Sequence, residues 1–366
     1  MIDAQLVERA KSLIDDLAQT PRFAGSAEEA RARRRCRTEL ETAGFVCSEI
    51  PFSYSEWPGR WGPPLLALFF TGYLVSFLEF GVRGSLSGSR WIWFVALWVA
   101  PWAYRFFTRG ILTFGFSRAS STNLEARRGD ATVWLVAHVD SKSQTIPMLL
   151  RVAGSAALPV AAVLAVIGVA LALMQLPIDF YFFRTAEIIA LVGAVPTVFC
   201  FIRNTSRGAL DNATGVAAVL LAAGAPAAPH SLGVLITSAE ELGLAGARTW
   251  ANSIAAKLVV LNCDTVDDAG EWRCMYSGNE PTRLTLAAEA VCFKLGTHIR
   301  IGRLIPGIMA DNMAFSERFH SAITLSRGTL GTLARIHTAR DNSARLTGEG
   351  AAEASVLLSA MAKELS

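Results

Sequence analysis

Two long apolar blocks, residues 61–107 and 148–202, interrupt a chain that otherwise has the composition of an ordinary globular protein. Of its 366 residues 52% are hydrophobic, the mean hydropathy is +0.36, and these blocks carry the excess. Each block holds two apolar runs near the roughly 17–25 residues that a membrane-spanning helix needs. Four such runs exceed what one globular core can cover, so the blocks predict about four transmembrane helices in two hairpins.

The four apolar runs differ in strength. Residues 63–80 and 91–107 flank a polar loop in the first block, and residues 152–176 form the clearest span of the chain. A short turn separates that span from residues 186–202, where nearby charges shorten the apolar core. The alternative is that all four are buried helices of a large soluble fold.

Positive charges around the hairpins predict their orientation. Each hairpin crosses the membrane twice, so all polar parts of the chain stay on one side. Arginine and lysine are more frequent on that side than at the hairpin tips. This bias predicts that the polar parts face the cytoplasm, at the inner or plasma membrane if the protein is bacterial. The polar side carries Arg60, Arg105, Arg109, Arg118, Lys142, Arg151, Arg203 and Arg207, and the tips carry Arg83, Arg90 and Arg184.

The polar remainder alternates short apolar, β-rich runs with helical segments. Runs at 132–137, 232–237, 258–263 and 321–326 predict buried strands of an α/β three-layer sandwich with a largely parallel central sheet. Ser26 and Glu29 predict a capping box for a helix that Gly44 ends. The expected domain is discontinuous: residues 1–60, 111–147 and 204–366 form it, and residues 61–110 and 148–203 form the hairpins.

Composition also limits the partners. The net charge is +3 and only 18% of residues are charged, which gives no basic surface for nucleic acid. The six cysteines include no CxxC pair, so we expect reduced, buried thiols.

Carboxylates and imidazoles follow the predicted strands. Parallel strands end at the same edge of a sheet, where ligands bind. Each residue alone also fits a helix cap or a hydrogen-bonded side chain. Together they would repel one another without cations, and mixed imidazole and carboxylate ligands suit zinc or a similar divalent ion. The segments are His138-Val139-Asp140, Asp211-Asn212, Glu240-Glu241, Asp264 and His337 through Asn342.

These segments resemble a known family. In order, AHVDS, ALDNATGVAAVL, TSAEELGLAGAR, LNCD and IHTARDN are similar to the cocatalytic two-zinc exopeptidases, which include bacterial leucyl aminopeptidases, glutamate carboxypeptidase and glutaminyl cyclase. The stretch RFAGS resembles the opening of that family's first conserved helix. The two hairpins are insertions relative to the family.

The resemblance implies a role for each residue. His138 and Asp264 would hold one zinc, Glu241 and His337 the other, and Asp211 would bridge the two. Glu240 would be the general base that activates a water between the metals, and Asp140 would orient His138 from behind, with Asp341 bracing the His337 loop. On an extended segment consecutive side chains point in opposite directions, so Glu241 would reach a metal while Glu240 faces the water.

One part of the family pattern is degraded. The family often has Ser-Asp-His before a phenylalanine, where this chain has Ala310-Asp311-Asn312. Asp311 is expected near the pocket, but the missing histidine leaves the substrate contacts open. The remaining histidines, His230, His298 and His320, match no motif and are expected to be structural.

The expected function is that of a membrane-anchored zinc-dependent exopeptidase, an aminopeptidase, with two zinc ions per chain. Its partners would be a peptide substrate, hydrophobic or membrane-associated if the hairpins present it, and the lipid bilayer. Two alternatives stay open: an aminoacyl transferase with a single zinc, like glutaminyl cyclase, and a non-catalytic membrane receptor with a peptidase-like head. Substrate specificity, the choice between amino- and carboxypeptidase activity, the metal actually loaded and the oligomeric state are left open.

Overall fold

A computed structural model describes residues 3–82, 98–99, 102–103, 111–176, 178–305 and 307–366. The chain divides into two compact units. We call them the polar unit, which comprises Met1–Tyr54, Arg118–Ser143 and Arg203–Ser366, and the apolar unit, which comprises Ser55–Ser117 and Gln144–Ile202.

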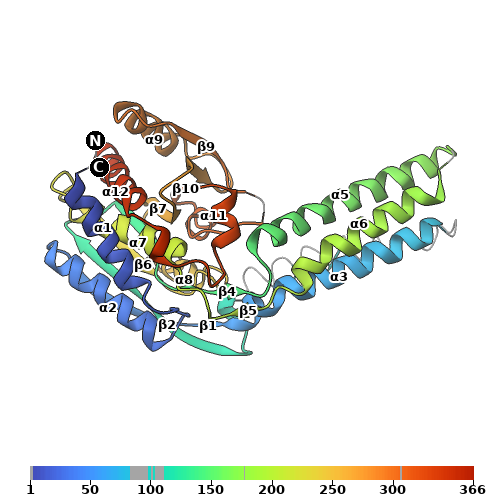
Figure 1. Cartoon of the computed structure of the whole chain (residues 1–366), viewed down its shortest axis with the longest axis horizontal. Coiled ribbons are helices and arrows are strands. Elements are labelled where there is room, and N and C mark those ends of the chain that lie inside the picture. Colours follow the sequence, from blue (N-terminus) through green and yellow to red (C-terminus); the bar gives the residue numbers. More distant parts are fainter. Residues whose placement is uncertain (1–2, 83–97, 100–101, 104–110, 177, 306) are drawn as a thin grey trace. The chain divides into compact units, whose positions relative to one another are not determined.

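The polar unit is built on one large sheet (Figure 1). Among the described residues it has eight strands in the order β1-β2-β6-β3-β7-β10-β8-β9. The pairs β3–β6, β3–β7, β7–β10 and β8–β9 are parallel, whereas β2–β6 and β8–β10 are antiparallel. The strands are β1 (Val46–Ser55), β2 (Arg118–Arg128), β3 (Val133–His138), β6 (Leu232–Thr237), β7 (Val259–Val266), β8 (Glu271–Tyr276), β9 (Ile299–Arg303) and β10 (Ser321–Gly328). The predicted, largely parallel sheet is confirmed.

Helices cover both faces of this sheet. On one face lie α8 (Ala245–Ser253) and α10 (Asn312–Ser316), with a cluster of aromatic rings. In this cluster the ring centroid of Trp250 lies 4.7 Å from that of Trp134 and 5.9 Å from that of Phe315. On the other face, α7 (Thr214–Ala223) and α12 (Glu349–Leu365) lie against β3 and β7. Every residue of β3 and β6 is buried, which explains their continuous apolar sequence. The three-layer arrangement is confirmed.

The remaining helices of the polar unit lie at its ends and edges. Helix α1 (Ala4–Leu17) packs on α7 and α12, and α9 (Thr282–Lys294) packs on α12 (Figure 1). Short segments complete the fold: η1 (Ala209–Ala213), α11 (Leu330–Arg335) and η2 (Ser343–Arg345). A small separate sheet joins β4 (Ser143–Gln144) to β5 (Ile202–Arg203).

Helix α2 (Ala27–Thr42) begins and ends where the sequence predicts. Ser26 Oγ accepts a hydrogen bond from Glu29 N at 3.1 Å, but the Glu29 carboxylate accepts from Gly25 N at 2.7 Å instead of from Ser26 N. The expected reciprocal capping box is therefore only half formed, because Glu29 turns toward buried groups. At the other end Gly44 has φ +82°, and Phe45 N donates to Leu40 O, which closes a Schellman turn.

The apolar unit consists of long helices that lie side by side (Figure 1). Three helices among the described residues are long and apolar enough to cross a membrane: α3 (Glu56–Val82), α5 (Met148–Leu173) and α6 (Phe180–Val198). The predicted second span, residues 91–107, lies mostly outside the described residues.

Helix α6 differs from its prediction. The Asp179 side chain caps it at Tyr181 N, so residues expected to form a turn start the helix. Arg184 Nη1 contacts both Glu187 and Glu79 of α3. The charges that weaken this run in the sequence are therefore paired with one another, and the helix is longer than its uncharged stretch.

Candidate metal centre

The carboxyl ends of three neighbouring parallel strands bring the predicted residues together. His138 is the last residue of β3, Glu240 and Glu241 follow β6, and Asp264 lies two residues before the end of β7. All of these side chains except that of Asp264, which is partly exposed, are buried. The strand order β6-β3-β7 makes them neighbours although they are far apart in the chain.

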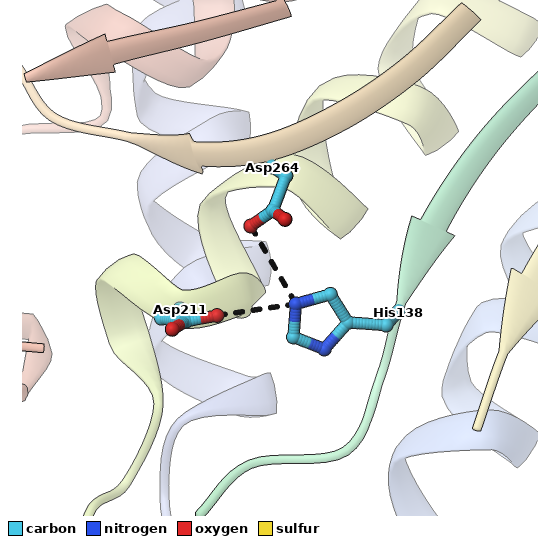
Figure 2. A group of neighbouring side chains, drawn as sticks. All are labelled: His138, Asp211 and Asp264. Atoms are coloured by element: carbon cyan, nitrogen blue, oxygen red, sulfur yellow. Dashed lines mark ion pairs between the residues drawn. The ribbon is translucent and has the colours of Figure 1, made fainter. Parts of the chain in front are cut away.

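The first group of candidate ligands contains His138, Asp211 and Asp264 (Figure 2). His138 Nε2 lies 3.1 Å from Asp211 Oδ1 and 3.5 Å from Asp264 Oδ1. Figure 2 shows one nitrogen of the imidazole facing both carboxylates, which come from different elements.

The second group contains Asp211, Glu241 and His337. His337 Nε2 lies 3.0 Å from Asp211 Oδ2 and 3.2 Å from Glu241 Oε1. Asp211 thus presents one oxygen to each group, which is the geometry of a bridging carboxylate. In each group the ligand atoms lie within 4.8 Å of one another.

Several of these atoms are buried without a hydrogen bond. Within the described part of the chain, His138 Nε2, His337 Nε2 and Glu241 Oε1 have no hydrogen-bond partner. The ligand atoms nearest to them lie only 3.0 to 3.2 Å away. Buried polar atoms are rarely left unpaired. Imidazole nitrogens and carboxylate oxygens that converge in this way fit zinc, which binds both atom types.

The charges in the site are consistent with a cation. Burial alone lowers the pKa of His138, but the carboxylates around it, Glu240 foremost, raise that pKa well above its usual value. The pKa of His337 is likewise raised by Glu241 and Asp211 against the effect of burial. Each imidazole is therefore held in a strongly negative environment.

Glu240 is buried beside both groups but belongs to neither. Burial, with the nearby carboxylates of Glu241 and Asp264, raises its pKa well above the usual value for a glutamate. The charged form of Glu240 is therefore unfavourable among these carboxylates unless a cation lies beside it.

The two glutamates lie in a turn, not on an extended segment. Gly243 N and Leu244 N both donate to Glu240 O, and Ala239 has φ +54°. The alternation expected for an extended segment therefore does not apply. The Asp140 carboxylate accepts from Glu240 N and Glu241 N, each at 3.2 Å, and so fixes this turn.

Asp140 lies behind His138, as the resemblance implies, but its nearest contact is through the backbone. His138 Nδ1 lies 3.1 Å from Asp140 O and 3.7 Å from Asp140 Oδ1. The carboxylate is thus mainly occupied with the turn that carries the glutamates.

Asn212 was named in the sequence only as the neighbour of Asp211, but it has a role of its own in the site. Its Nδ2 donates to Cys263 O at 2.9 Å, and its Oδ1 accepts from Gly215 N and Thr265 N, each at 3.1 Å. It therefore links the segment that carries Asp211 to the strand that carries Asp264. A Cβ on Gly215 would lie 2.2 Å from Asn212 Oδ1, so only glycine fits there.

Asp341 and Asp311 lie near the groups in different ways. Asp341 Oδ1 accepts from Leu210 N at 2.6 Å and Oδ2 from Asp211 N at 3.3 Å, so it ties the loop after His337 to the Asp211 segment. Asp311 Oδ2 accepts from Thr237 Oγ1 at 2.5 Å, its Oδ1 has no partner among the described residues, and burial raises its pKa to about 7.

Arg22, in the stretch RFAGS, holds the backbone around the site. Its fully buried guanidinium donates to Val139 O at 2.8 Å, Arg207 O at 2.6 Å, Gly208 O at 2.9 Å and Leu17 O at 2.8 Å. It therefore joins the segment after His138 to the segment before Asp211. Burial lowers its pKa to about 10, which leaves it charged at neutral pH.

Lys142 has a role in the site that the sequence did not indicate. It was counted among the charges that flank the hairpins, but its side chain is buried and its Nζ lies 2.6 Å from Glu241 Oε2. The signal was its position directly after the AHVDS motif.

Other predicted residues lie outside the centre. His230, His298 and His320 belong to neither ligand group among the described residues, and His320 Nδ1 accepts from Leu258 N at 3.3 Å. All six cysteines are free, and five are buried.

The geometry agrees with a known family. Residues 194–362 match the model of Peptidase family M28. This chain is similar to that family over its C-terminal half, where Asp211, Glu241, Asp264 and His337 lie. That similarity supports a metallopeptidase-like hydrolase and implies zinc as the metal. No curated protein sequence matches the chain.

Solved structures of aminopeptidases and glutaminyl cyclases share the fold. An aminopeptidase from Aneurinibacillus sp. strain AM-1 matches with a TM-score of 0.57 and 14% identity, over 97% of this chain and 92% of that one. A zinc aminopeptidase from Bacillus subtilis matches with a TM-score of 0.57 and 12% identity, over 98% and 95%. A glutaminyl cyclase from Fimbriiglobus ruber matches with a TM-score of 0.55 and 13% identity, over 98% and 95%.

Proposed function

We propose that this chain is a membrane-anchored, zinc-dependent aminopeptidase that hydrolyses short peptides. The observation that carries the proposal is the pair of buried ligand groups that share Asp211, with Glu240 beside them and in neither. The family match supports a peptidase, and aminopeptidases among the similar folds favour removal of an N-terminal residue.

Five side chains would hold two zinc ions. His138 and Asp264 would bind one, Glu241 and His337 the other, and Asp211 both. Bound zinc would lower the pKa of a water molecule and polarise the carbonyl of the scissile peptide bond.

Glu240 would move the proton. Its carboxylate takes a proton from the attacking water and returns it to the leaving amine, so that the peptide bond is exchanged for an acid and an amine. Asp140 would keep the carboxylate in place by holding the backbone N–H groups of Glu240 and Glu241.

Replacing the base tests the proposal. Glu240→Gln keeps the size of the side chain but cannot accept the proton, so we expect peptide hydrolysis to fall about 10²–10⁴-fold. Zinc content, measured by mass spectrometry, should be unchanged. Glu28→Gln, the same change on an exposed face of α2, should keep full activity. Hydrolysis by the Glu240 variant at the normal rate would refute this role.

We further propose that the apolar unit anchors the chain, with the polar unit in the cytoplasm. Three described helices are long and apolar enough to span a bilayer. Lys142 no longer supports the orientation, because it is buried at the metal centre, but Arg60, Arg151 and Arg203 still lie near the ends of the spans. Reporter fusions at both termini should read cytoplasmic. A readout from the opposite side would reverse the orientation.

A glutaminyl-cyclase-like transferase is the second candidate, because glutaminyl cyclases match the fold about as well as aminopeptidases do. Incubation with a peptide that begins with glutamine distinguishes the two. An aminopeptidase releases free glutamine and shortens the peptide by one residue. A cyclase keeps the length of the peptide, cyclises its N-terminal glutamine and releases ammonia. The same assay with lipid-linked and soluble peptides tests whether the substrate is membrane-associated.

A further inference from the structure

Lys142 brings a fixed positive charge to one of the two ligand groups. Its side chain is only 9% exposed, its Nζ lies 2.6 Å from Glu241 Oε2, and the same Nζ donates to Glu241 O at 3.0 Å. A buried ammonium must be paired, and this one is paired with a candidate metal ligand.

The other ligand group has no such cation. In the part of the chain that the structure describes, no lysine or arginine makes an ion pair with Asp211 or Asp264, and their ion-pair contacts are to imidazoles. The nearest buried arginine, Arg22, acts on Asp211 only electrostatically and without an ion-pair contact, because its guanidinium donates to backbone carbonyls. The negative charge that attracts a divalent ion is therefore less neutralised around His138, Asp211 and Asp264. Around Glu241 the negative charge is partly neutralised by Lys142 even when no metal is bound.

We propose that Lys142 makes the two metal positions unequal. The position formed by His138, Asp211 and Asp264 binds zinc tightly, and the position formed by Asp211, Glu241 and His337 binds it weakly and reversibly. A cation bound to one oxygen of Glu241 repels a divalent ion bound to the other oxygen, and this repulsion is strong in a buried site. The inference rests on the proposed function, because it takes these side chains to be the zinc ligands.

Lys142 also orients Glu241, and this effect has the opposite sign, since outer partners that fix a ligand usually strengthen metal binding. Here the orientation does not depend on Lys142 alone. Glu241 N is held by the Asp140 carboxylate at 3.2 Å, and Glu241 Oε1 lies 3.2 Å from His337 Nε2. The ligand stays in place without the lysine, so its charge is the larger effect.

A consequence is that the free zinc concentration controls how far the weaker position, formed by Asp211, Glu241 and His337, is occupied. At low free zinc the chain would carry one ion, and the second would load only as free zinc rises. The tightly bound ion would remain through this change.

Zinc titration of the full chain in detergent tests the inference. Metal-free protein is titrated against a chromophoric chelator, which reports each binding constant without any activity assay. We expect two steps whose affinities differ by at least about tenfold, and loss of the weaker step in His337→Ala. Lys142→Met should strengthen the weaker step by about tenfold and leave the stronger step unchanged.

Two further variants control the experiment. Lys142→Arg keeps the charge and should keep the steps unequal. Lys294→Met removes an exposed lysine of α9 that pairs with Glu364 and should change neither step. If Lys142→Met does not fold by circular dichroism, Lys142→Gln takes its place.

The outcomes separate the two proposals. Equal steps in the natural chain, or a weaker step that Lys142→Met leaves unchanged or weakens, would overturn the role of Lys142 while the zinc site stands. Failure of the natural chain to bind any zinc would overturn the proposed function itself, and this inference with it.

Discussion

The two units of this chain differ in which apolar side chains they expose. In the polar unit the core contains large rings, such as Trp134, Trp250 and Phe315. In the apolar unit the buried cluster combines alanines, such as Ala161 and Ala186, with large side chains, such as Phe77 and Leu78. Other large aliphatic side chains of this unit point outward, among them Val160, Val163, Ile188 and Val192, each at least half exposed.

This difference shows what each unit is built to contact. Burying large apolar side chains removes them from water, which stabilises a fold in aqueous solution. In a bilayer that gain is absent, and helices associate through small residues that allow close packing. Gly154 and Gly193 fit this pattern, because a Cβ on Gly154 would lie 2.5 Å from Gly193 O. The outward aliphatic side chains and the close helix contact at Gly154 are what the proposed membrane anchor would require.

The largest effect is expected from emptying the core of the polar unit. Trp250→Ala removes a ring that is 1% exposed and in contact with Trp134, and we expect it to lower the free energy of unfolding by about 3–5 kcal/mol. Urea denaturation followed by circular dichroism measures this. Phe293→Ala, which removes a ring that is 87% exposed, should have almost no effect.

The polar unit also buries a titratable group, Glu29, whereas the core cluster of the apolar unit holds none. Burial raises the pKa of Glu29 from 4.5 to about 7. The folded state then binds the proton more tightly than the unfolded state, so stability falls as pH rises from 4.5 to about 7. At about 1.4 kcal/mol per pH unit, the free energy of unfolding is lower by about 3 kcal/mol once the pH exceeds about 7.

Glu29→Gln should remove this loss. Its amide oxygen can still accept from Gly25 N and Ser121 Oγ, as the carboxylate does. Denaturation at pH 5 and pH 8 measures the free energy of unfolding of both proteins. Relative to the natural chain, the variant should be more stable at pH 8 than at pH 5. An equal difference at both pH values would mean that Glu29 titrates normally.

A charge on the outward face tests the apolar unit directly. Val163→Arg places a guanidinium near the middle of α5, where insertion into a bilayer should become less favourable by about 3 kcal/mol. A glycosylation-mapping assay in microsomes measures the inserted fraction. Leu286→Arg, on an exposed position of the polar unit, should leave insertion unchanged. Normal insertion of the Val163 variant would argue that lipid does not contact this face.

The smallest effect is expected from enlarging a helix contact in the apolar unit. A Cβ on Gly193 would lie 2.5 Å from Ala157 Cβ, so Gly193→Leu should overpack α5 against α6 and cost about 1–3 kcal/mol. Val192→Leu, on the neighbouring outward position, is the control. The two variants are compared by unfolding the detergent-solubilised protein with increasing SDS. Equal unfolding midpoints for Gly193→Leu and Val192→Leu would contradict the close packing of α5 against α6.

The sequence predicted the central strands because their residues are mostly apolar. It did not predict every end, because β7 continues past Asp264 to Val266 and β10 continues past Arg327 to Gly328. It did not predict β1, β8 and β9, whose side chains are partly exposed and mix apolar with charged residues. Such strands carry no periodic signal strong enough to separate them from loops.

The candidate site was predictable in its members but not in its contacts. Motif order indicated His138, Asp211 and His337, but Lys142 acquires its role only when β3 and β6 lie side by side. The turn at Glu240 depends on Asp140, about a hundred residues earlier in the chain. Contacts of this kind are set by tertiary structure, which local patterns do not encode.

The polar unit is assembled from three separate stretches, and this imposes an order on its biosynthesis. Strand β3 pairs with β6 and β7, which the ribosome makes only after α5 and α6. The sheet edge that gathers His138, Glu241 and Asp264 therefore cannot exist until the apolar helices have emerged. A nascent chain carries no formed metal centre, and hydrolytic capacity arises only after the segments that would fasten it to a membrane have been made.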